Sequence, residues 1–348
     1  MTLKKVARLA GVSHTTVSLV INNVKGSRVS PRTRKRVLAA ARKLDYNPNL
    51  LAQRLVSGKS NSIGLFVPYI TSIFRNYTMV ELMAGVQDVL NEKGFDLVLF
   101  SGGRNLYRHR PISQIARQNT LDGLIIFNTR DTTHDYIEKY INNLSRLDFN
   151  FVAVEYYRGD ADINYVGIDS EKNAFKTVSY MAFLGHRKIA MLAGPADAVV
   201  STRFIRGYQN AFNSSRLEVD EKLLVFCRYD QQEAYEKTLH LIQEYPDISC
   251  FILAGYEMAP GCLKAIKDAG YRIPEDISIV AYADNATLLL LEPPLTAVRL
   301  PYYEMGRKAA EIVVENPEKK KKYIFESQLI ERDSTCGPPE HSGGLTGK

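Results

Sequence analysis

The first 46 residues carry apolar side chains at helical spacing and predict short helices separated by tight turns. A first helix can follow Thr2, which would cap it. Its apolar positions are Leu3, Val6, Ala7, Leu9 and Ala10. Gly11 permits a left-handed turn, and Ser13 can cap a second helix from about His14 to Ile21. Two short helices joined by a glycine-containing turn are typical of a helix-turn-helix.

A third helix is predicted after the polar loop 22–28, and it would support the first two. Ser30 can cap this helix, and Pro31 suits its first turn, where the missing amide hydrogen costs no hydrogen bond. Apolar residues continue at helical spacing through Val37, Leu38, Ala41 and Leu44. We therefore expect residues 1–46 to form a helix-turn-helix domain.

The next segment, residues 47–60, predicts a hinge. Residues 48–58 could form one short helix, and a helix of about ten residues is marginal on its own in water. The polar run 57–61 follows and is typical of a flexible linker. We therefore expect a separate body to begin after this segment.

From Ser62 onward, strand-like apolar runs alternate with helical segments. Strands are predicted at 63–67, 97–100, 123–127, 151–154, 165–168, 188–193, 223–226, 250–253 and 277–281, with helices that include 76–93, 202–213 and 257–270. This alternation implies parallel sheets with helices on both faces. Two rounds of it, the second beginning near Tyr165, predict two α/β halves. Ligands in such folds bind at the carboxyl ends of the strands, which here would face a cleft between the halves.

Charge is divided unequally between the two parts of the chain. The net charge is +7, but residues 1–60 hold thirteen Lys or Arg and one acid, Asp45, so they carry +12. The other 288 residues then carry 7 − 12 = −5. This asymmetry indicates a head that binds a polyanion, attached to a mildly acidic body.

Several classes of protein are disfavoured by what the sequence lacks. It has neither an apolar run of about 18 residues nor a signal-peptide core, so we expect a cytoplasmic protein with no membrane contact. The four cysteines form no C-x-x-C pair, and no disulfide, metal or other cofactor is expected. Catalytic motifs are missing, and His186 at a predicted helix end is expected to contribute charge there rather than catalysis. The sequence therefore predicts a protein that is not an enzyme.

The chain resembles the LacI/GalR (lactose repressor) family of transcriptional regulators along most of its length. Matching residues in the head and hinge are Thr2-Leu3, Val6-Ala7, Ala10-Gly11-Val12-Ser13, Thr16-Val17-Ser18, Asn22, Val29-Ser30, Thr33, Tyr46-Asn47-Pro48-Asn49, Ala52, Leu55 and Ile63-Gly64. Matching residues in the body are 121–126, 184–190, Arg203, 207–208, 269–280 and 294–296. The resemblance implies an N-terminal all-α helix-turn-helix head plus an α/β body of two Rossmann-like subdomains, similar to a periplasmic binding protein.

The same resemblance implies the domain boundaries. The head would span 1–46 and the hinge helix and linker 47–60. Three chain crossings would join the two halves of the body. The N-terminal subdomain would then comprise 61–162 plus 295–325, and the C-terminal subdomain 163–294 plus 326–335. The Gly-rich residues 336–348 are expected to be a loose tail.

The resemblance makes the second helix the recognition helix in the major groove. His14, Thr15 and Ser18 would then read base edges, while Ser13 and Thr16 hold phosphates. The full set of expected DNA-binding residues is Thr2, Ser13, His14, Thr15, Thr16, Ser18, Asn22, Ser30, Thr33, Asn49, Ala52 and Leu55. Leu55 matches a leucine that wedges open a base step in the minor groove, the alternative being a buried leucine between domains.

Two departures from the family pattern affect the head. The family usually has an acid where this chain has Lys5, and the loop 22–28 is about two residues longer than usual by comparison with that pattern. Both changes lie beside the helix-turn-helix rather than within it. We therefore expect altered contacts to the DNA backbone near this loop, with the same mode of binding.

An effector pocket between the halves is also implied by the resemblance. The expected pocket residues are Asn76, Tyr77, Met79, Glu155, Asp169, Arg203, Tyr229, Tyr256, Asp284 and Tyr302. Arg203 would hold polar groups of the effector with its planar guanidinium, and Tyr229 would stack on it. The effector would be a sugar derivative or another polar or aromatic metabolite.

Departures in this pocket argue against an ordinary monosaccharide. The family commonly has Ala-Asn-Asp where this chain reads Ala254-Gly255-Tyr256, and Ala283 replaces a carboxylate that grips sugar hydroxyls in many members. The hypothesis is a less polar, aromatic-bearing or acidic effector, held by Arg203, Tyr229 and Tyr256. The alternative is a degenerate pocket, with control by a protein partner or by none.

The resemblance further implies a homodimer on a pseudo-palindromic DNA operator, acting in the commoner family mode as a repressor at the bacterial nucleoid. Leucine heptads are missing near the C-terminus, so a zipper-built tetramer is not expected. Rival classes are an enzyme with a DNA-binding head, a solute-binding protein and a nonspecific architectural DNA binder. The missing catalytic motifs disfavour an enzyme, and the basic head disfavours a solute-binding protein. The two-lobed body disfavours a nonspecific architectural DNA binder.

Overall fold

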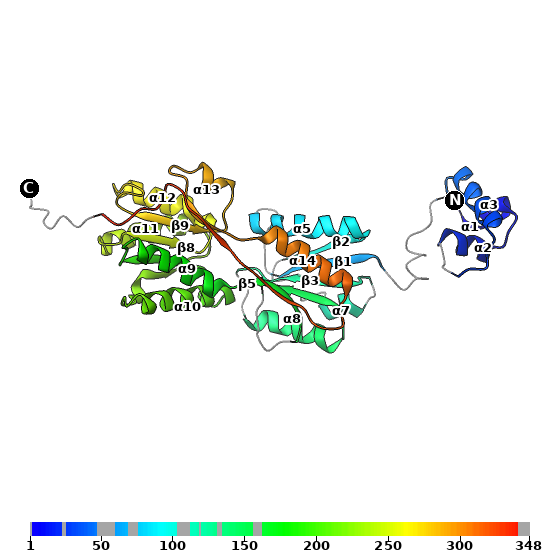
Figure 1. Cartoon of the computed structure of the whole chain (residues 1–348), viewed down its shortest axis with the longest axis horizontal. Coiled ribbons are helices and arrows are strands. Elements are labelled where there is room, and N and C mark those ends of the chain that lie inside the picture. The colour runs from blue at the N-terminus through cyan, green and yellow to red at the C-terminus, as the bar shows by residue number, and fades with distance from the viewer. Residues whose placement is uncertain are drawn as a thin grey trace, which may run out of the picture. The chain divides into compact units, whose positions relative to one another are not determined.

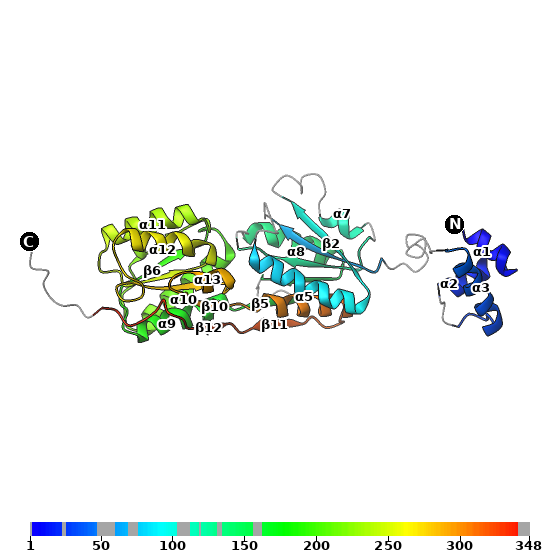
Figure 2. The same ribbon diagram turned by 90° about the horizontal axis from the view of Figure 1, so that it is seen from above.

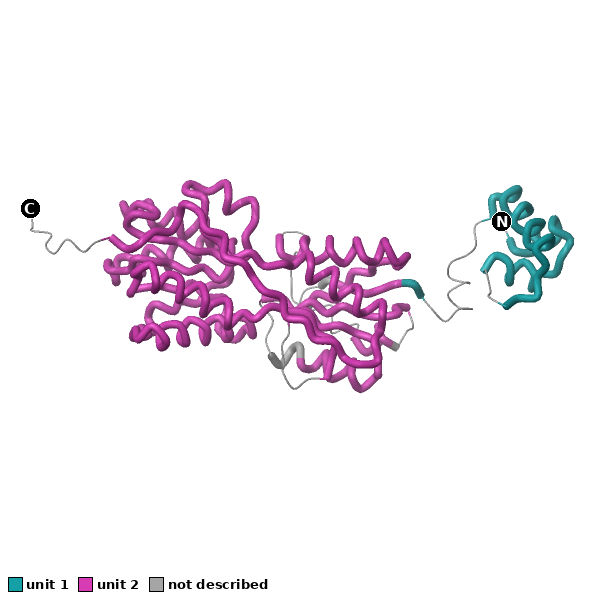
Figure 3. The backbone as a smooth tube through the Cα atoms, in the orientation of Figure 1, with its two compact units in different colours: residues 1–61 teal, residues 62–348 magenta. Residues whose placement is uncertain are grey.

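The structure is a computed structural model that describes residues 2–22, 26–46, 60–68, 76–102, 112–117, 120–130, 134–155 and 162–339. The chain divides into two compact units, Met1–Asn61 and Ser62–Lys348, which Figure 3 shows in different colours. Each unit encloses its own hydrophobic core. The head and body expected from the sequence are therefore separate bodies.

The described part of the first unit contains α1 (Leu3–Ala10), α2 (His14–Ile21) and α3 (Pro31–Lys43) (Figure 1). Gly11 ends α1 in the left-handed conformation, with a φ of 60°. Ser13 caps α2 and Ser30 caps α3, each by accepting a hydrogen bond from the backbone three residues ahead. Thr2 occupies the cap position of α1, but its side chain makes no capping hydrogen bond.

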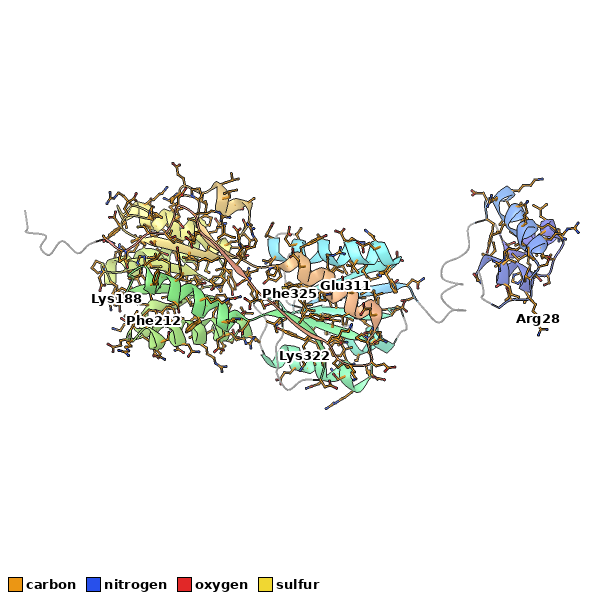
Figure 4. All side chains as sticks on the ribbon, viewed as in Figure 1. Arg28, Lys188, Phe212, Glu311, Lys322 and Phe325 are labelled. Carbon is orange, nitrogen blue, oxygen red and sulfur yellow. The ribbon has the colours of Figure 1, made fainter. Side chains whose placement is uncertain are left out.

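Small apolar residues from all three helices form the core of this unit. They are Val6, Ala7, Ala10, Val17, Val20, Val37, Ala40 and Ala41. Leu9 and Leu38 share the predicted apolar pattern but are exposed, because they lie on the outer faces of α1 and α3. Arg28 also projects outward from this unit (Figure 4).

The first lobe of the second unit is built on a parallel six-stranded sheet in the order β11-β5-β4-β3-β1-β2. Its strands are β1 (Ser62–Pro68), β2 (Asp96–Gly102), β3 (Gly123–Phe127), β4 (Phe151–Val154), β5 (Asn164–Ile168) and β11 (Lys322–Phe325). Its helices are α5 (Tyr77–Lys93), α7 (Ile112–Arg117), α8 (His134–Arg146) and α14 (Tyr302–Glu315). One core lies between the sheet and α5 with α14, and a second between the sheet and α7 with α8.

The second lobe contains another six-stranded sheet, in the order β12-β10-β9-β8-β6-β7. Its strands are β6 (Ile189–Ala193), β7 (Leu224–Phe226), β8 (Cys250–Leu253), β9 (Ser278–Tyr282), β10 (Thr296–Arg299) and the antiparallel β12 (Gln328–Ile330). Its helices are α9 (Ser170–Phe183), α10 (Val199–Ser214), α11 (Gln231–Glu244), α12 (Ala259–Asp268) and α13 (Ala286–Leu290). Figure 1 shows α9 and α10 on one side of this sheet and α11 and α12 on the other.

The chain crosses between the lobes three times: after β5, between β10 and α14, and between β11 and β12. Figure 2 shows the last crossing as a continuous segment running from one lobe to the other. Two expected boundaries need correction. β5 pairs with β4 and β11, so residues 163–168 belong to the first lobe, and β10 pairs with β9, so residues 295–299 belong to the second. The third boundary, after Phe325, lies where the sequence placed it.

Helices pack at glycine contacts in both lobes. A Cβ atom on Gly306 of α14 would lie 2.2 Å from the backbone oxygen of Leu82 on α5, and one on Gly85 of α5 would lie 2.0 Å from the oxygen of Tyr303. A Cβ atom on Gly207 of α10 would lie 2.2 Å from the oxygen of Glu171 on α9. These distances are far below van der Waals contact, so the helix pairs require glycine here.

His186 has a structural role, but through hydrogen bonding rather than through charge. The residue is 1% exposed, and its ring has Nδ1 2.8 Å from Ser249 Oγ and Nε2 2.8 Å from the Cys336 backbone oxygen. Because a carbonyl oxygen only accepts, Nε2 donates and Nδ1 accepts from the serine hydroxyl. Burial lowers the pKa of His186, so the ring is neutral at pH 7 and ties the segment around Cys336 to the second lobe.

Candidate functional site

The N-terminal turn of α2 is built to present polar side chains to solvent. Ser13 Oγ accepts a hydrogen bond from Thr16 N at 3.1 Å and lies 2.8 Å from Thr16 Oγ1. Val17 and Val20 point into the core, which leaves His14 and Thr15 exposed at the start of the helix. Two of the three expected base readers, His14 and Thr15, therefore lie at the exposed N-terminal turn of the helix, where a major groove could receive them, whereas Ser18 is half-buried further along it.

The remaining head residues support this helix. Asn22 Nδ2 donates to Ser18 Oγ at 3.2 Å, so these two expected DNA-binding residues lie together at the C-terminal end of α2. Ser30 and Thr33 repeat the capping pattern at the start of α3. Arg36 donates from α3 to the backbone oxygens of Ala10 and Gly11 and so fixes the turn before α2.

Cations are spread over the exposed surface of the described head. The exposed ones are Lys4, Lys5, Arg8, Arg28, Arg32, Lys35, Arg36, Arg42 and Lys43. A surface of this kind attracts the phosphates of a nucleic acid and releases their counterions. Asn49, Ala52 and Leu55, the expected hinge contacts, lie outside the described residues.

In the body, the expected pocket forms where strands of both lobes end. Arg130 and Glu155 follow β3 and β4 of the first lobe, and Tyr229, Tyr256 and Ala283 follow β7, β8 and β9 of the second. In parallel sheets such loops converge on one edge. The two edges face each other and make direct contact across the cleft.

An ion pair joins the lobes at the centre of this cleft. Arg130 donates from Nη1 to Glu257 Oε2 at 3.1 Å and from Nη2 to Glu257 Oε1 at 2.5 Å. The two side chains are only 15% and 20% exposed. Burial alone would lower the pKa of Arg130, but the Glu257 carboxylate raises it above its usual value and keeps the guanidinium ionised.

The ring of Tyr229 packs against one face of the same guanidinium. The Arg130 carbon Cζ lies 4.1 Å from the centre of the Tyr229 ring, a cation–π arrangement. The ring itself is placed by a left-handed backbone at Tyr229, with a φ of 57°. The predicted stacking aromatic is thus in the cleft, and its face is occupied by an arginine of the protein.

A second contact across the cleft involves two tyrosines. Tyr77 N donates to Tyr256 Oη at 3.2 Å, and the two rings meet edge to face with centroids 6.4 Å apart. Together with the ion pair, this contact closes the cleft. The cavity left inside measures about 20 Å³, which accommodates about one water molecule. It is lined by residues of both lobes, among them Arg130, Glu155, Asn173, Phe204 and Tyr302.

Glu155 contributes a buried carboxyl group to this cavity. Its Oε1 accepts a hydrogen bond from Ile168 N at 3.1 Å, and its backbone oxygen accepts one from Asn128 Nδ2 at 2.8 Å. Burial raises the pKa of Glu155 to about 8, although the Ile168 hydrogen bond and the charge of Arg203 oppose the shift. The carboxyl group is therefore protonated at pH 7.

A larger pocket of about 430 Å³ lies beside the crossings between the lobes. Tyr77, Tyr302 and Asp284 line it, together with Arg299 and other polar residues. Asp284 is paired with Arg299 at 2.9 Å and with Arg332 at 2.8 Å. The carboxylate expected to bind effector is therefore held by two arginines of the protein.

The other expected pocket residues have structural positions in this closed form. Asn76 and Asp169 cap α5 and α9 by accepting hydrogen bonds from Met79 N and Lys172 N. Met79, also expected in the pocket, has its side chain fully buried in the core under α5, because it lies on the sheet-facing side of that helix. Arg203 lies on α10, near enough to Glu155 to influence its pKa.

Sequence reasoning missed the central pair of the cleft. Arg130 lies three residues after the end of the buried strand β3, and a charged residue in the loop at a strand end is a signal that could have been used. Glu257 lies in the segment that departs from the family pattern, next to Gly255 and Tyr256. The residues around it in the sequence do not indicate that its partner is Arg130, 127 residues away.

No group of three or more His, Cys, Asp or Glu side chains among the described residues is arranged to hold a metal ion. None of the helices in that part of the chain has the length and apolar character needed to cross a membrane.

Comparison with known proteins agrees with the fold. A family described as bacterial regulatory proteins, lacI family, matches residues 2–49, and a periplasmic binding protein-like domain matches residues 178–335. RegA of Clostridium saccharobutylicum, an HTH-type transcriptional regulator, is 29% identical over 339 residues, which are 96% of this chain and 98% of that protein. The repressor PurR of Vibrio atlanticus is 28% identical over 341 residues, again 96% and 98% of the two chains.

Two solved structures extend the comparison. The regulator CelR in complex with cellobiose superposes with a TM-score of 0.71 at 28% identity, covering 96% of this chain and 99% of that one. A Lac repressor dimer bound to operator and an anti-inducer superposes with a TM-score of 0.83, covering 97% and 99%. Its identity is 23%, so it supports the fold alone.

The head, the two-lobed body and these relatives define a DNA-binding transcriptional regulator with a ligand-binding domain, and not an enzyme. The chain belongs to the LacI family of bacterial regulators. The family and the fold class predicted from the sequence are thereby confirmed.

Proposed function

We propose that this protein represses transcription by binding a pseudo-palindromic operator as a homodimer, and that a small molecule in the cleft between its lobes controls this binding. The observation that carries the proposal is the exposed N-terminal turn of α2, with His14 and Thr15 free of the core on a strongly basic head. Two such heads related by two-fold symmetry would read two half-sites. The Lac repressor structure, titled as a dimer on operator, is a precedent.

Control by a small molecule would act through linkage. An effector that binds one arrangement of the lobes better than the other shifts the population between them, and the affinity for DNA follows. The cleft is suited to this role because the Arg130–Glu257 pair and the Tyr77–Tyr256 contact both bridge the lobes. The cellobiose complex of CelR is a precedent for a ligand in a relative.

Selection from a pool of random DNA duplexes tests the DNA-binding part of the proposal. The full chain should enrich one pseudo-palindromic sequence, and binding to it should survive an excess of random duplex. His14→Ala should reduce that preference, whereas Lys188→Ala, on the body, should not. A protein that enriches no sequence would be a nonspecific binder, and the proposal would be wrong.

Sedimentation of the free protein tests the dimer. A single species of twice the chain mass is expected, and a stable tetramer would contradict the assembly proposed.

Control without a small molecule is the second candidate. It is favoured because the protein's own side chains fill the cleft at Arg130, where the remaining cavity measures about 20 Å³. A partner protein, or no regulator at all, would then replace the effector. Operator binding repeated with a metabolite panel separates the two candidates. A metabolite that changes operator affinity supports small-molecule control, whereas an unchanged affinity across the panel supports the second candidate.

A further inference from the structure

The cation at the centre of the cleft already holds a carboxylate. Glu257 presents both oxygens to the guanidinium edge of Arg130, at 2.5 and 3.1 Å, from the opposite lobe. The planar fork of an arginine fits a carboxylate in this two-point geometry better than it fits a hydroxyl group. A free carboxylate could make the same contacts if Glu257 moved away.

Gly255 provides the space for this arrangement. A Cβ atom at position 255 would lie 2.5 Å from Arg130 Nη1, 2.7 Å from Tyr229 Cδ1 and 2.9 Å from Glu257 Oε2. The backbone of Gly255 is extended, so glycine is favoured here by the space that these side chains occupy and not by the backbone conformation. The absence of a side chain at position 255 therefore leaves room for the Arg130–Glu257 pair beside the Tyr229 ring.

Other groups around the adjoining cavity favour an anion. Asn173 is 5% exposed and lines the cavity, and its Nδ2 donor has no hydrogen-bond acceptor among the described residues. The first turn of α10 contributes Val200 to the lining. Its cap position is Ala198, which has no side chain that could cap the helix, so the amide N–H groups of this turn can serve an anion. Glu155 is protonated at pH 7, which leaves Arg130 as the ionised side chain in the lining.

Apart from Ser170 and the hydroxyl groups of Tyr282 and Tyr302, the rest of the lining is apolar. The second lobe and the adjoining crossing contribute Val200, Phe204, Ala254, Tyr282, Ala283 and Leu300. A sugar ring would lose the hydrogen bonds of its hydroxyl groups on such a surface, whereas an alkyl or aromatic group would not.

We propose that the effector is an organic acid with an apolar or aromatic body, whose carboxylate displaces Glu257 from Arg130. This inference rests on the proposed function and specifies the chemistry of its ligand. Displacement frees Glu257 and breaks the ion pair between the lobes, so binding of the acid would change the lobe arrangement directly. Arg130 is then the anchor for the ligand, and Glu257 is its intramolecular competitor.

Calorimetry on the full-length protein tests this with matched probes: benzoate against benzamide, hexanoate against hexanamide, and glucuronate against glucose. We expect at least one acid to bind and its neutral counterpart to bind at least tenfold more weakly. Arg130→Gln should weaken the binding of that acid at least tenfold. Glu257→Gln should strengthen it several-fold, because the competing charge is gone while the shape is kept. Arg272→Gln, which removes an exposed arginine paired with Asp276, is the control and should change nothing.

The Glu257→Gln variant separates ligand recognition from a purely structural ion pair. A structural pair predicts equal or weaker acid binding in this variant, and that result would overturn the inference. Tight binding of a neutral probe that persists in Arg130→Gln would also overturn it, as would failure of every acid to bind both wild type and Glu257→Gln. Operator binding measured on the same preparations reports independently on the proposed function, since it can succeed while the acid hypothesis fails.

Discussion

At the scale of single residues, Glu155 combines an unusual backbone with a buried acid. Its φ of 60° lies in the left-handed region that non-glycine residues seldom adopt. The residue is 9% exposed, and its carboxyl group has a pKa of about 8. Strain and burial of this kind are typical of functional positions, because nothing in folding alone favours them.

Glu155 should make the stability of the body depend on pH in a defined window. Its pKa is about 8 in the folded chain against a usual value of 4.5, so the folded state holds a proton that the unfolded state releases. The free energy of unfolding should therefore fall as pH rises from about 4.5 to about 8, by about 1.4 kcal/mol for each unit of the shift. Glu155→Gln should lack this component, so its advantage over wild type should grow with pH in urea denaturation.

The exposed substitution Glu304→Gln is the matched control for that experiment. Its denaturation profile should follow wild type at each pH. If wild type and Glu155→Gln showed parallel profiles between pH 5 and 8, the carboxyl group would be ionised in the folded protein.

His186 predicts the opposite dependence at lower pH. Its pKa is lowered by burial, so protonation disfavours the folded state. The stability that it contributes is complete above its usual pKa of 6.5 and is lost as pH falls below that value. A His186→Gln variant should be less stable than wild type at pH 7.5, and the difference should shrink at pH 5. A constant difference would show that the ring does not titrate.

Local sequence could identify several pocket residues but not their pairing. Tyr302 lines the cavity in the cleft, and Tyr229 and Tyr256 contact residues of the opposite lobe there. Each of the three follows a strand end or a crossing, which the alternation of strands and helices could reveal. The partner of Arg130 depends on which loops of two different sheets face each other. That is decided by how the lobes meet, and no spacing along the chain encodes it.

At the scale of elements, the cap of the recognition helix offers a matched comparison. Ser13 and Thr2 both occupy cap positions, but only Ser13 makes a capping hydrogen bond. Ser13→Ala should therefore destabilise the head by about 1 kcal/mol, and Thr2→Ala by less than half as much. Hydrogen exchange of the α2 amides in the full chain measures the difference. Equal losses would show that the Ser13 hydrogen bond contributes nothing.

The glycine contact between α5 and α14 gives a second prediction at this scale. A methyl group at position 306 would meet the backbone oxygen of Leu82, which cannot move without shifting its helix. Gly306→Ala should lower the unfolding free energy of the body by about 1–3 kcal/mol, as overpacking does. Glu304→Ala, exposed on the same helix, should change it by less than about 0.5 kcal/mol. Calorimetric melting of both variants is the measurement, and equal melting would contradict the close contact.

Most elements of the body could be predicted, and the exceptions have physical reasons. Helix α11 was missed because 231–244 is polar overall, although Ala234, Thr238, Leu241 and Ile242 repeat at helical spacing and are buried. Strand β5 was predicted at its position, whereas β10 was not predicted as a strand. The expected domain boundaries placed the residues of both strands in the wrong lobe. A strand next to a crossing is apolar in either sheet, so its own residues do not reveal its neighbours.

At the scale of the whole molecule, the charge division predicts how DNA affinity responds to salt. Each phosphate neutralised by the head releases counterions, so the logarithm of affinity should fall linearly with the logarithm of salt concentration. Arg32→Ala, at the exposed start of α3, should reduce the slope by about 1. Lys188→Ala on the body should leave the slope unchanged. Filter binding between low and physiological salt measures both, and a slope near zero for wild type would exclude a phosphate-binding head.

The crossings between the lobes also determine the order in which the molecule can be completed during synthesis. The sheet of the first lobe receives its last strand, β11, only when residues 322–325 have left the ribosome, after most of the second lobe has emerged. Until then β5 is an open edge that can pair with other chains. A message truncated before codon 322 would therefore yield a complete DNA-binding head on a body that cannot finish either sheet.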